Sequence, residues 1–125
     1  MASKKAKVAL VEDDIAIVQM YRLKFEAEGY EVQTAGDGVA GLKLIKEFKP
    51  DIVLLDMMMP TMNGIEVLRQ LRRDAATKEL KVVVLTNMGD AETAEQLRKL
   101  KANDYIIKAE MTPKQVSDKV KQLLA

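Results

Sequence analysis

The chain has 125 residues, which is enough for one domain with a substantial core and too few for two. Hydrophobic residues make up 48% and charged residues 31% of it, and the formal net charge of +1 directs it towards neither nucleic acid nor acidic lipid. It contains no cysteine and no histidine, which excludes disulfides, thiolate and histidine metal sites, and histidine acid–base catalysis. Carboxylates, hydroxyls, lysines or the backbone must therefore carry any chemistry.

Nothing in the sequence indicates a membrane or export. No apolar run reaches the ~18 residues that a membrane span needs, and the opening MASKKAK lacks the apolar core of a signal peptide. We therefore expect a cytoplasmic protein that consists of a single domain over residues 1–125, in which residues 1–6 form a basic, solvated tail.

Short apolar runs alternate with helical periodicities along the whole chain. The first strand is expected at Lys7–Val11, and the first helix has Asp14 as its N-cap and Gly29 as its stop. The predicted strands are 7–11, 31–35, 52–56, 81–85 and 104–107, and the predicted helices are 15–28, 39–48, 65–73, 91–101 and 113–124. Five such β-α pairs predict an α/β fold with a doubly wound parallel sheet and helices on both faces.

The stretch 52–64, IVLLDMMMPTMNG, is the one around which the chain is organised. Four apolar residues run directly into Asp56, and such a run bounded by turn residues indicates a strand buried on both faces. A carboxylate at the point where this strand leaves the core must be solvated or held by partners.

Polar residues of particular types end four of the five predicted strands. Glu12 and Asp13 follow the first strand, Asp56 ends the third, and Thr86 and Lys108 follow the fourth and fifth. In open parallel sheets, ligands bind outside the carboxyl ends of the strands, where the strand order reverses. With the order 2-1-3-4-5, the first and third strands are neighbours, so we expect these side chains to converge.

Converging carboxylates need positive charge, because two of them ~4 Å apart repel by about 4 kcal/mol at an effective dielectric of ~20. Lys108 supplies one charge, and a hard divalent cation, Mg²⁺ or else Mn²⁺, would supply the rest through oxygen ligands. Asp56 is then the candidate phosphoryl acceptor, because carboxylates form aspartyl phosphates. Lys108 would neutralise one phosphoryl oxygen and the Thr86 hydroxyl would bond another. Each residue alone indicates only a cap or a solvated charge, whereas together they form a specific pattern.

The segments VEDD, LLDMMMPTMNG, VVLTN and YIIK resemble, in order and spacing, the receiver domain of bacterial two-component response regulators. The resemblance extends from Lys7 to Leu124 and is to the single-domain, chemotaxis type with its flavodoxin-like fold. It implies that a sensor histidine kinase phosphorylates Asp56 and that the Met58 carbonyl joins Glu12, Asp13 and Asp56 around Mg²⁺. Such a domain assists its own phosphorylation without being an enzyme in the usual sense.

The resemblance also implies a switch. Thr86 and Tyr105 would be the switch hydroxyl and the switch aromatic. The surface of the predicted segments 91–101, 104–107 and 113–124 would then bind a downstream protein or a second copy, and no direct contact with nucleic acid or membrane is implied.

The sequence departs from the family at Ala109 and Asn87, and Met58 and Met88 occupy positions that tune dephosphorylation in the family. Ala109 stands where proline usually follows the lysine, so we expect a trans bond at Lys108–Ala109 or a strained cis one. Asn87 replaces a small residue and would crowd the phosphoryl group. Met58 and Met88 are apolar and cannot orient an attacking water, from which we hypothesise slow hydrolysis of the phosphorylated state.

Three other functions compete with this interpretation. A flavin-binding protein conflicts with the acids 12–14, which would repel a phosphate, and an aspartate phosphatase would need a second Asp at position 58. The remaining alternative is a degenerate receiver that keeps the fold and acts only as a protein-interaction module.

Overall fold

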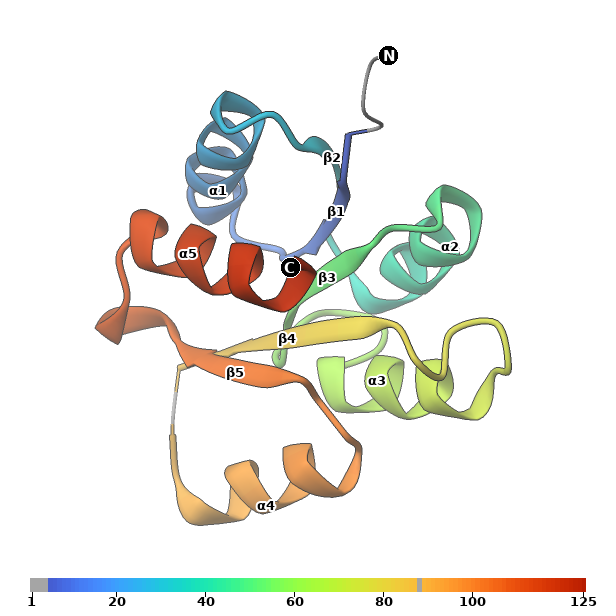
Figure 1. The fold of residues 1–125 in the computed structure, drawn as a ribbon. Helices are drawn as coiled ribbons and strands as arrows, with labels where there is room; N and C mark the ends of the chain where they lie inside the picture. The colour runs from blue at the N-terminus through green and yellow to red at the C-terminus, as the bar shows by residue number, and fades with distance from the viewer. Residues whose placement is uncertain (1–4, 88) are drawn as a thin grey trace.

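The structure, a computed structural model, describes residues 5–87 and 89–125 as five strands and five α-helices with one short 3₁₀ turn (Figure 1). The strands are β1 (Lys7–Val11), β2 (Glu31–Ala35), β3 (Ile52–Asp56), β4 (Lys81–Thr86) and β5 (Asp104–Ile107). The helices are α1 (Ile15–Ala27), α2 (Gly38–Phe48), α3 (Gly64–Arg73), α4 (Ala91–Lys99), the 3₁₀ turn η1 (Lys108–Glu110) and α5 (Pro113–Leu124). Residues 1–4 of the expected basic tail lie outside the described residues.

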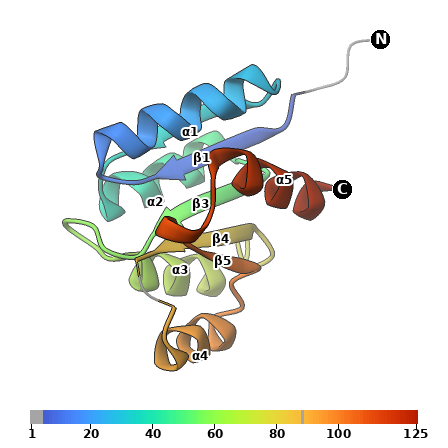
Figure 2. The same ribbon diagram turned by 90° about the vertical axis from the view of Figure 1, so that its left-hand side faces the viewer.

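The strands form one parallel sheet in the order β2-β1-β3-β4-β5, which confirms the predicted fold. Helices α1 and α5 cover one face, and α2, α3 and α4 cover the other (Figures 1 and 2). None of the helices in the described part of the chain has the length and hydropathy that crossing a bilayer requires.

Two hydrophobic cores sandwich the central strands. Alternate residues of β3 point to opposite faces, so Ile52 and Leu54 join the core under α1 and α5 while Val53 and Leu55 join the core under α2, α3 and α4. All four side chains are completely buried. The unbroken apolar run before Asp56 is thus explained by helices on both faces of the sheet.

The helix ends match the sequence signals except at α4. Asp14 accepts hydrogen bonds from the first turn of α1, and Gly29 adopts a left-handed φ of 94° after its end. Helix α4 ends at Lys99 rather than at residue 101, because Leu100 caps it and Lys101 turns to a left-handed φ of 59°. The 3₁₀ turn at Lys108–Glu110 was not predicted.

Arg72, in the last turn of α3, joins two loops at the amino end of the sheet. Its guanidinium donates hydrogen bonds to the carbonyl oxygens of Leu80 (2.8 Å), Lys101 (2.9 Å) and Leu100 (3.2 Å). Carbonyls at helix ends and in turns lack backbone partners, and Arg72 satisfies several of them at once. The residue thereby holds the connections that lead into β4 and β5.

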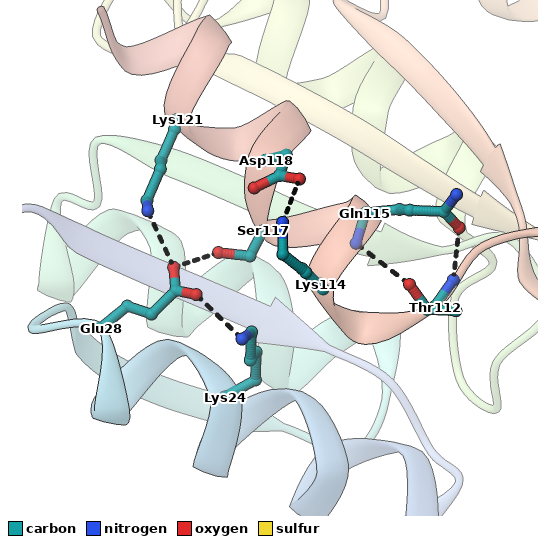
Figure 3. A network of polar contacts seen from close by, with 8 residues as sticks. All are labelled: Lys24, Glu28, Thr112, Lys114, Gln115, Ser117, Asp118 and Lys121. Atoms are coloured by element: carbon teal, nitrogen blue, oxygen red, sulfur yellow. Dashed lines mark hydrogen bonds and ion pairs between the residues drawn. The ribbon is translucent and has the colours of Figure 1, made fainter.

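A second polar network joins α1 to α5 on the opposite face (Figure 3). Glu28, the C-cap of α1, accepts a hydrogen bond from the buried hydroxyl of Ser117 on α5. The same carboxylate contacts Lys24 Nζ at 3.1 Å and Lys121 Nζ at 3.6 Å. The hydrogen bond from Ser117, and then that from Lys24, lower the pKa of Glu28.

We predict that Arg72→Met lowers the free energy of unfolding by about 2–3 kcal/mol, because several carbonyls lose a charged donor. Arg72→Lys should recover only part of the loss, since one ammonium cannot span both loops. Urea unfolding followed by circular dichroism measures both. Arg98→Met, which removes an exposed i, i+3 partner of Glu95, is the matched control and should leave the urea midpoint nearly unchanged. Equal effects of Arg72→Met and Arg98→Met would contradict the prediction.

The lowered pKa of Glu28 predicts acid sensitivity of the α1–α5 contact. A carboxyl whose pKa is lower in the folded state stabilises the fold above its unfolded value of 4.5, and this stabilisation is lost as the pH falls through the folded value. Glu28→Gln should therefore cost about 1 kcal/mol at pH 7 and flatten the decline in stability between pH 5 and pH 3. Thermal melts across this range test it, with the exposed Glu47→Gln on α2 as control.

Candidate functional site

Three acidic side chains meet at the carboxyl ends of β1 and β3, which point to the same side of the sheet (Figure 2). Val11 pairs with Leu55, so the residues that follow, Glu12 and Asp56, leave the two strands side by side. One carboxylate oxygen from each of Glu12, Asp13 and Asp56 lies within 4.8 Å of the other two. The convergence expected from the strand order is therefore present.

The three acids differ in their contact with water. Glu12 and Asp56 are buried, with 1% and 3% of their surfaces exposed, whereas Asp13 is exposed. Buried carboxylates are costly unless a cation or hydrogen-bond donors accompany them. The exposed Asp13 leaves one side of the cluster open to solvent and to ligands.

Lys108 supplies the positive charge. It begins the η1 turn after β5, and its Nζ lies 2.7 Å from Glu12 Oε1 and 3.1 Å from Asp56 Oδ1. Only 15% of its side chain is exposed, so the ammonium is enclosed with its two partners. Lys108 therefore bridges both buried acids and ties β5 to the centre of the sheet.

The electrostatics of this cluster favour additional positive charge. Burial raises the pKa of Glu12 to about 7, with Asp56 adding to the rise while Lys108 and the Asp14 N–H oppose it. Burial alone would lower the pKa of Lys108, but its contacts with Glu12 and Asp56 outweigh burial and raise it. One lysine therefore compensates two buried carboxylates incompletely.

The donor set fits a hard cation. Glu12 Oε1 is buried and, among the described residues, has an ion pair with Lys108 but no aligned hydrogen bond. This oxygen stands beside oxygens of Asp13 and Asp56, and oxygen-only ligation with an open side is typical of Mg²⁺ sites. The acidic triad is thus of a kind that can hold Mg²⁺.

Thr86 and Tyr105 lie on the strands that flank Asp56 on its other side. Asp56 pairs with Leu85, so Thr86, the last residue of β4, follows next to it, and only 5% of Thr86 is exposed. Tyr105, in the middle of β5, is half-buried and contacts the core under α2, α3 and α4. Their roles as a switch pair stay predictions.

The loop after β3 places the Met58 backbone beside Asp56. The Met58 N–H donates to Asp56 Oδ1 over 3.4 Å, while 71% of the residue is exposed. The Met58 backbone therefore lies beside Asp56, and its carbonyl remains a predicted metal ligand. The expectation for Met88 falls outside the described residues.

The backbone after Lys108 follows one of the two expected paths. No cis peptide bond occurs among the described residues, so the Lys108–Ala109 bond is trans. The chain takes the η1 turn, Lys108–Glu110, before the cap Thr112 starts α5. Without proline, the trans geometry avoids the roughly 3 kcal/mol that a non-proline cis bond would cost.

Sequence reasoning missed one residue on which the geometry depends. The Asn63-Gly64 pair predicts only a turn, but a Cβ on Gly64 would lie 2.2 Å from the Asp56 carbonyl oxygen. The first turn of α3 therefore lies so close to the Asp56 backbone that only glycine fits at position 64. The Asn-Gly pair after the strand was the available signal, and it did not reveal which backbone would come near.

The hollow beside the acids is small. Glu12 and Asp13 line a depression of about 180 Å³ together with Ile15 and Val18 of α1 and residues 34–36 at the end of β2. Sites for cofactor-sized molecules typically have roughly 300–1,000 Å³. This depression is too small for a flavin, and Asp56 is not among the residues that line it.

Known proteins are similar to this chain in both sequence and fold. The family model described as the response regulator receiver domain matches residues 8–121. The DNA-binding response regulator MtrA of Mycobacterium tuberculosis is 34% identical over 124 residues, which are 99% of this chain and 53% of MtrA. The phosphate regulon transcriptional regulatory protein PhoB of Rhizobium meliloti is 38% identical over 120 residues, 94% of this chain and 52% of PhoB. The chain thus spans about half the length of these relatives.

Solved structures give the same answer for the fold. The chemotaxis response regulator CheY4 of Vibrio cholerae superposes with a TM-score of 0.90 at 28% identity, covering 97% of this chain and 100% of CheY4. A CheY-like receiver domain protein of Methanospirillum hungatei superposes with a TM-score of 0.89 at 27% identity, covering 97% and 94%. Together with the acidic triad at the carboxyl ends of β1 and β3, these matches show that the chain belongs to the response regulator receiver domain family.

Proposed function

We propose that this chain is a phosphorylation-dependent signalling switch in which Asp56 accepts a phosphoryl group from a phosphohistidine of a sensor histidine kinase. The observation that carries the proposal is the buried Asp56 carboxylate, 3.1 Å from Lys108 and grouped with Glu12 and Asp13. An Asp56 oxygen would attack phosphorus, forming an acyl–phosphate bond while the N–P bond to the kinase histidine breaks. This chain has no histidine, so the donor histidine lies outside its 125 residues.

The residues around Asp56 would divide the remaining work. Phosphoryl transfer needs positioning and charge neutralisation more than covalent chemistry from the protein. The Lys108 ammonium would hold one phosphoryl oxygen, and the Thr86 hydroxyl would donate to another. Glu12, Asp13, Asp56 and the Met58 carbonyl would hold Mg²⁺, which supplies positive charge for the phosphoryl oxygens when bound.

Phosphorylation would then change the surface formed by α4, β5 and α5. Thr86 would move towards the phosphoryl group and Tyr105 would turn inward, shifting an equilibrium between two arrangements of this region. A downstream protein or a second copy of the chain would read the change. MtrA and PhoB are named as DNA-binding or transcriptional regulators, and any such output for this chain belongs to the same proposal.

Asp56 should be modified by a small phosphodonor. Incubation with acetyl phosphate and Mg²⁺ should add the mass of one phosphoryl group to the intact chain, and Asp56→Asn should abolish the addition. Asp51→Asn, an exposed aspartate just before β3 at the opposite end of that strand, should keep it and serves as the matched control. If the wild-type chain takes up neither a phosphoryl group nor beryllofluoride, it is an interaction module that has kept only the fold.

The stabilising effect of Mg²⁺ on the fold should depend on pH. Glu12 has a pKa of about 7 in the fold against 4.5 unfolded, so its contribution to stability is present below pH 4.5 and is lost as the pH rises through 7. Mg²⁺ relieves this loss, and it should raise the melting temperature by about 5 °C at pH 8 and by clearly less at pH 6. Differential scanning calorimetry with and without Mg²⁺ measures the difference.

Asp13→Asn serves as the control for that measurement. Removing one of three neighbouring carboxylates should raise the metal-free melting temperature and reduce the Mg²⁺ effect. An Mg²⁺ effect that is equal at both pH values, or unchanged in Asp13→Asn, would place the ion elsewhere on the protein.

A further inference from the structure

The loop between β3 and α3 is seated on the start of α2. Thr61, in this loop, adopts a left-handed φ of 65°, which is unusual for a β-branched residue. Such backbone conformations persist only where surrounding contacts hold them. The contacts of Thr61 therefore show which part of the protein holds the loop in place.

Those contacts lead to the N-cap of α2. The Thr61 hydroxyl donates to Asp37 Oδ1 at 3.0 Å and accepts from the Val39 N–H at 3.1 Å. The Gly38 N–H donates to the Pro60 carbonyl at 3.2 Å. The same Asp37 oxygen caps α2 by accepting from the Ala40 N–H at 2.8 Å.

The fit between loop and helix is close. A Cβ on Gly38 would lie 1.8 Å from the Met62 carbonyl oxygen, so the two backbones are in direct contact there. The hydrogen bond from the Ala40 N–H, and then that from Thr61, lower the pKa of Asp37, which keeps it an acceptor at neutral pH. The loop is therefore anchored to α2 by side-chain bonds, a backbone bond and van der Waals contact.

The other end of the same loop is fixed beside the acceptor. The Gly64 N–H donates to the Met57 carbonyl at 2.9 Å, and the Met58 N–H donates to Asp56 Oδ1 at 3.4 Å. Met58 thus lies between an anchor on α3 and an anchor on α2. A shift at Thr61 would be transmitted along three residues of backbone to Met58.

We propose that Asp37 and Thr61 form a clasp that positions the Met57–Met62 loop, and through it the Met58 backbone, over the Asp56 site. This inference rests on the proposed function, because Met58 matters only if the site holds Mg²⁺ and a phosphoryl group. Asp37 and Thr61 are positioning residues and touch neither. Their contribution is preorganisation: without the clasp, the loop would have to be ordered each time the cation binds.

Thr61→Val tests the clasp, since valine keeps the shape and the β-branching and removes only the hydroxyl. It should raise the Kd for Mg²⁺ by about tenfold, in the range that supporting hydrogen bonds show at metal sites. It should also speed amide hydrogen exchange across residues 57–62 in the metal-free protein. Nuclear magnetic resonance titration with Mg²⁺ alone and exchange measurements report both without phosphorylation. Thr61→Ser restores the hydroxyl and should restore the wild-type Kd.

Thr112→Val is the matched control. Thr112 caps α5 by accepting from the Gln115 N–H at 3.2 Å, so the same substitution removes a cap hydroxyl outside the loop. It should lower the melting temperature while leaving the Kd for Mg²⁺ unchanged. Thr61→Gly provides a second variant that relieves the backbone strain and folds readily, and it should weaken Mg²⁺ binding as Thr61→Val does.

The clasp and the proposed function fail in different ways. If the wild-type chain binds Mg²⁺ but takes up no phosphoryl group, the function is wrong, and the Kd and exchange measurements still decide the clasp. If Thr61→Val and Thr61→Gly lower the melting temperature as Thr112→Val does and change the Kd for Mg²⁺ by less than twofold, the clasp only stabilises the fold. In that case the positioning role is overturned.

Discussion

The contact on which the rest of this molecule depends is the bridge from one lysine to two buried carboxylates. Lys108 Nζ lies within 2.7 Å of Glu12 and 3.1 Å of Asp56, at the ends of three different strands. Two acids with almost no exposed surface would repel each other strongly in the protein interior without it. The bridge also provides one cation for two buried carboxylates, and burial, with Asp56 adding to it, raises the pKa of Glu12. Two buried carboxylates with only one lysine beside them can accept and release a further cation, and with it an anionic group.

The topology explains why such a cluster forms at this edge of the sheet. In a parallel sheet with helical crossovers, every helix begins at the edge where the strands end. Asp14, Asp37, Asn63, Asp90 and Thr112 cap the five α-helices there. The partial positive charge of the helix amino ends favours carboxylates and phosphoryl oxygens at this edge. At the opposite edge, Arg72 and Lys81 donate to carbonyls at the ends of the crossovers and of α5.

The sequence carried the fold and the convergence of the acids because both follow from periodicity and strand ends. The apolar run 52–55 could hardly be anything but a doubly buried strand, and the order 2-1-3-4-5 then brought Glu12 beside Asp56. What escaped were contacts between residues far apart in the chain. Nothing in the local pattern distinguished Arg72 from other exposed-looking helical arginines, or showed that Thr61 would meet Asp37. The early end of α4 escaped for a related reason, since a left-handed lysine at 101 leaves no mark comparable to a glycine. Side-chain direction and close backbone approach are set by packing, which periodicity does not encode.

Burial differs sharply between the two sides of Asp56, and this difference bears on how a switch could work. On one side, the loop after β3 is held against α2 and α3, and α3 buries four residues, Gly64, Val67, Leu68 and Leu71. On the other side, α4 buries a single residue, Leu97, and β5 is a four-residue edge strand that pairs only with β4. Segments with few buried contacts open at the lowest free-energy cost. If Asp56 were phosphorylated as proposed, the loop held by Asp37 and Thr61 could not move without breaking its contacts with α2. Under the proposed function, motion would therefore go to Thr86, Tyr105 and α4, and the rigidity of the loop after β3 would give the response its direction.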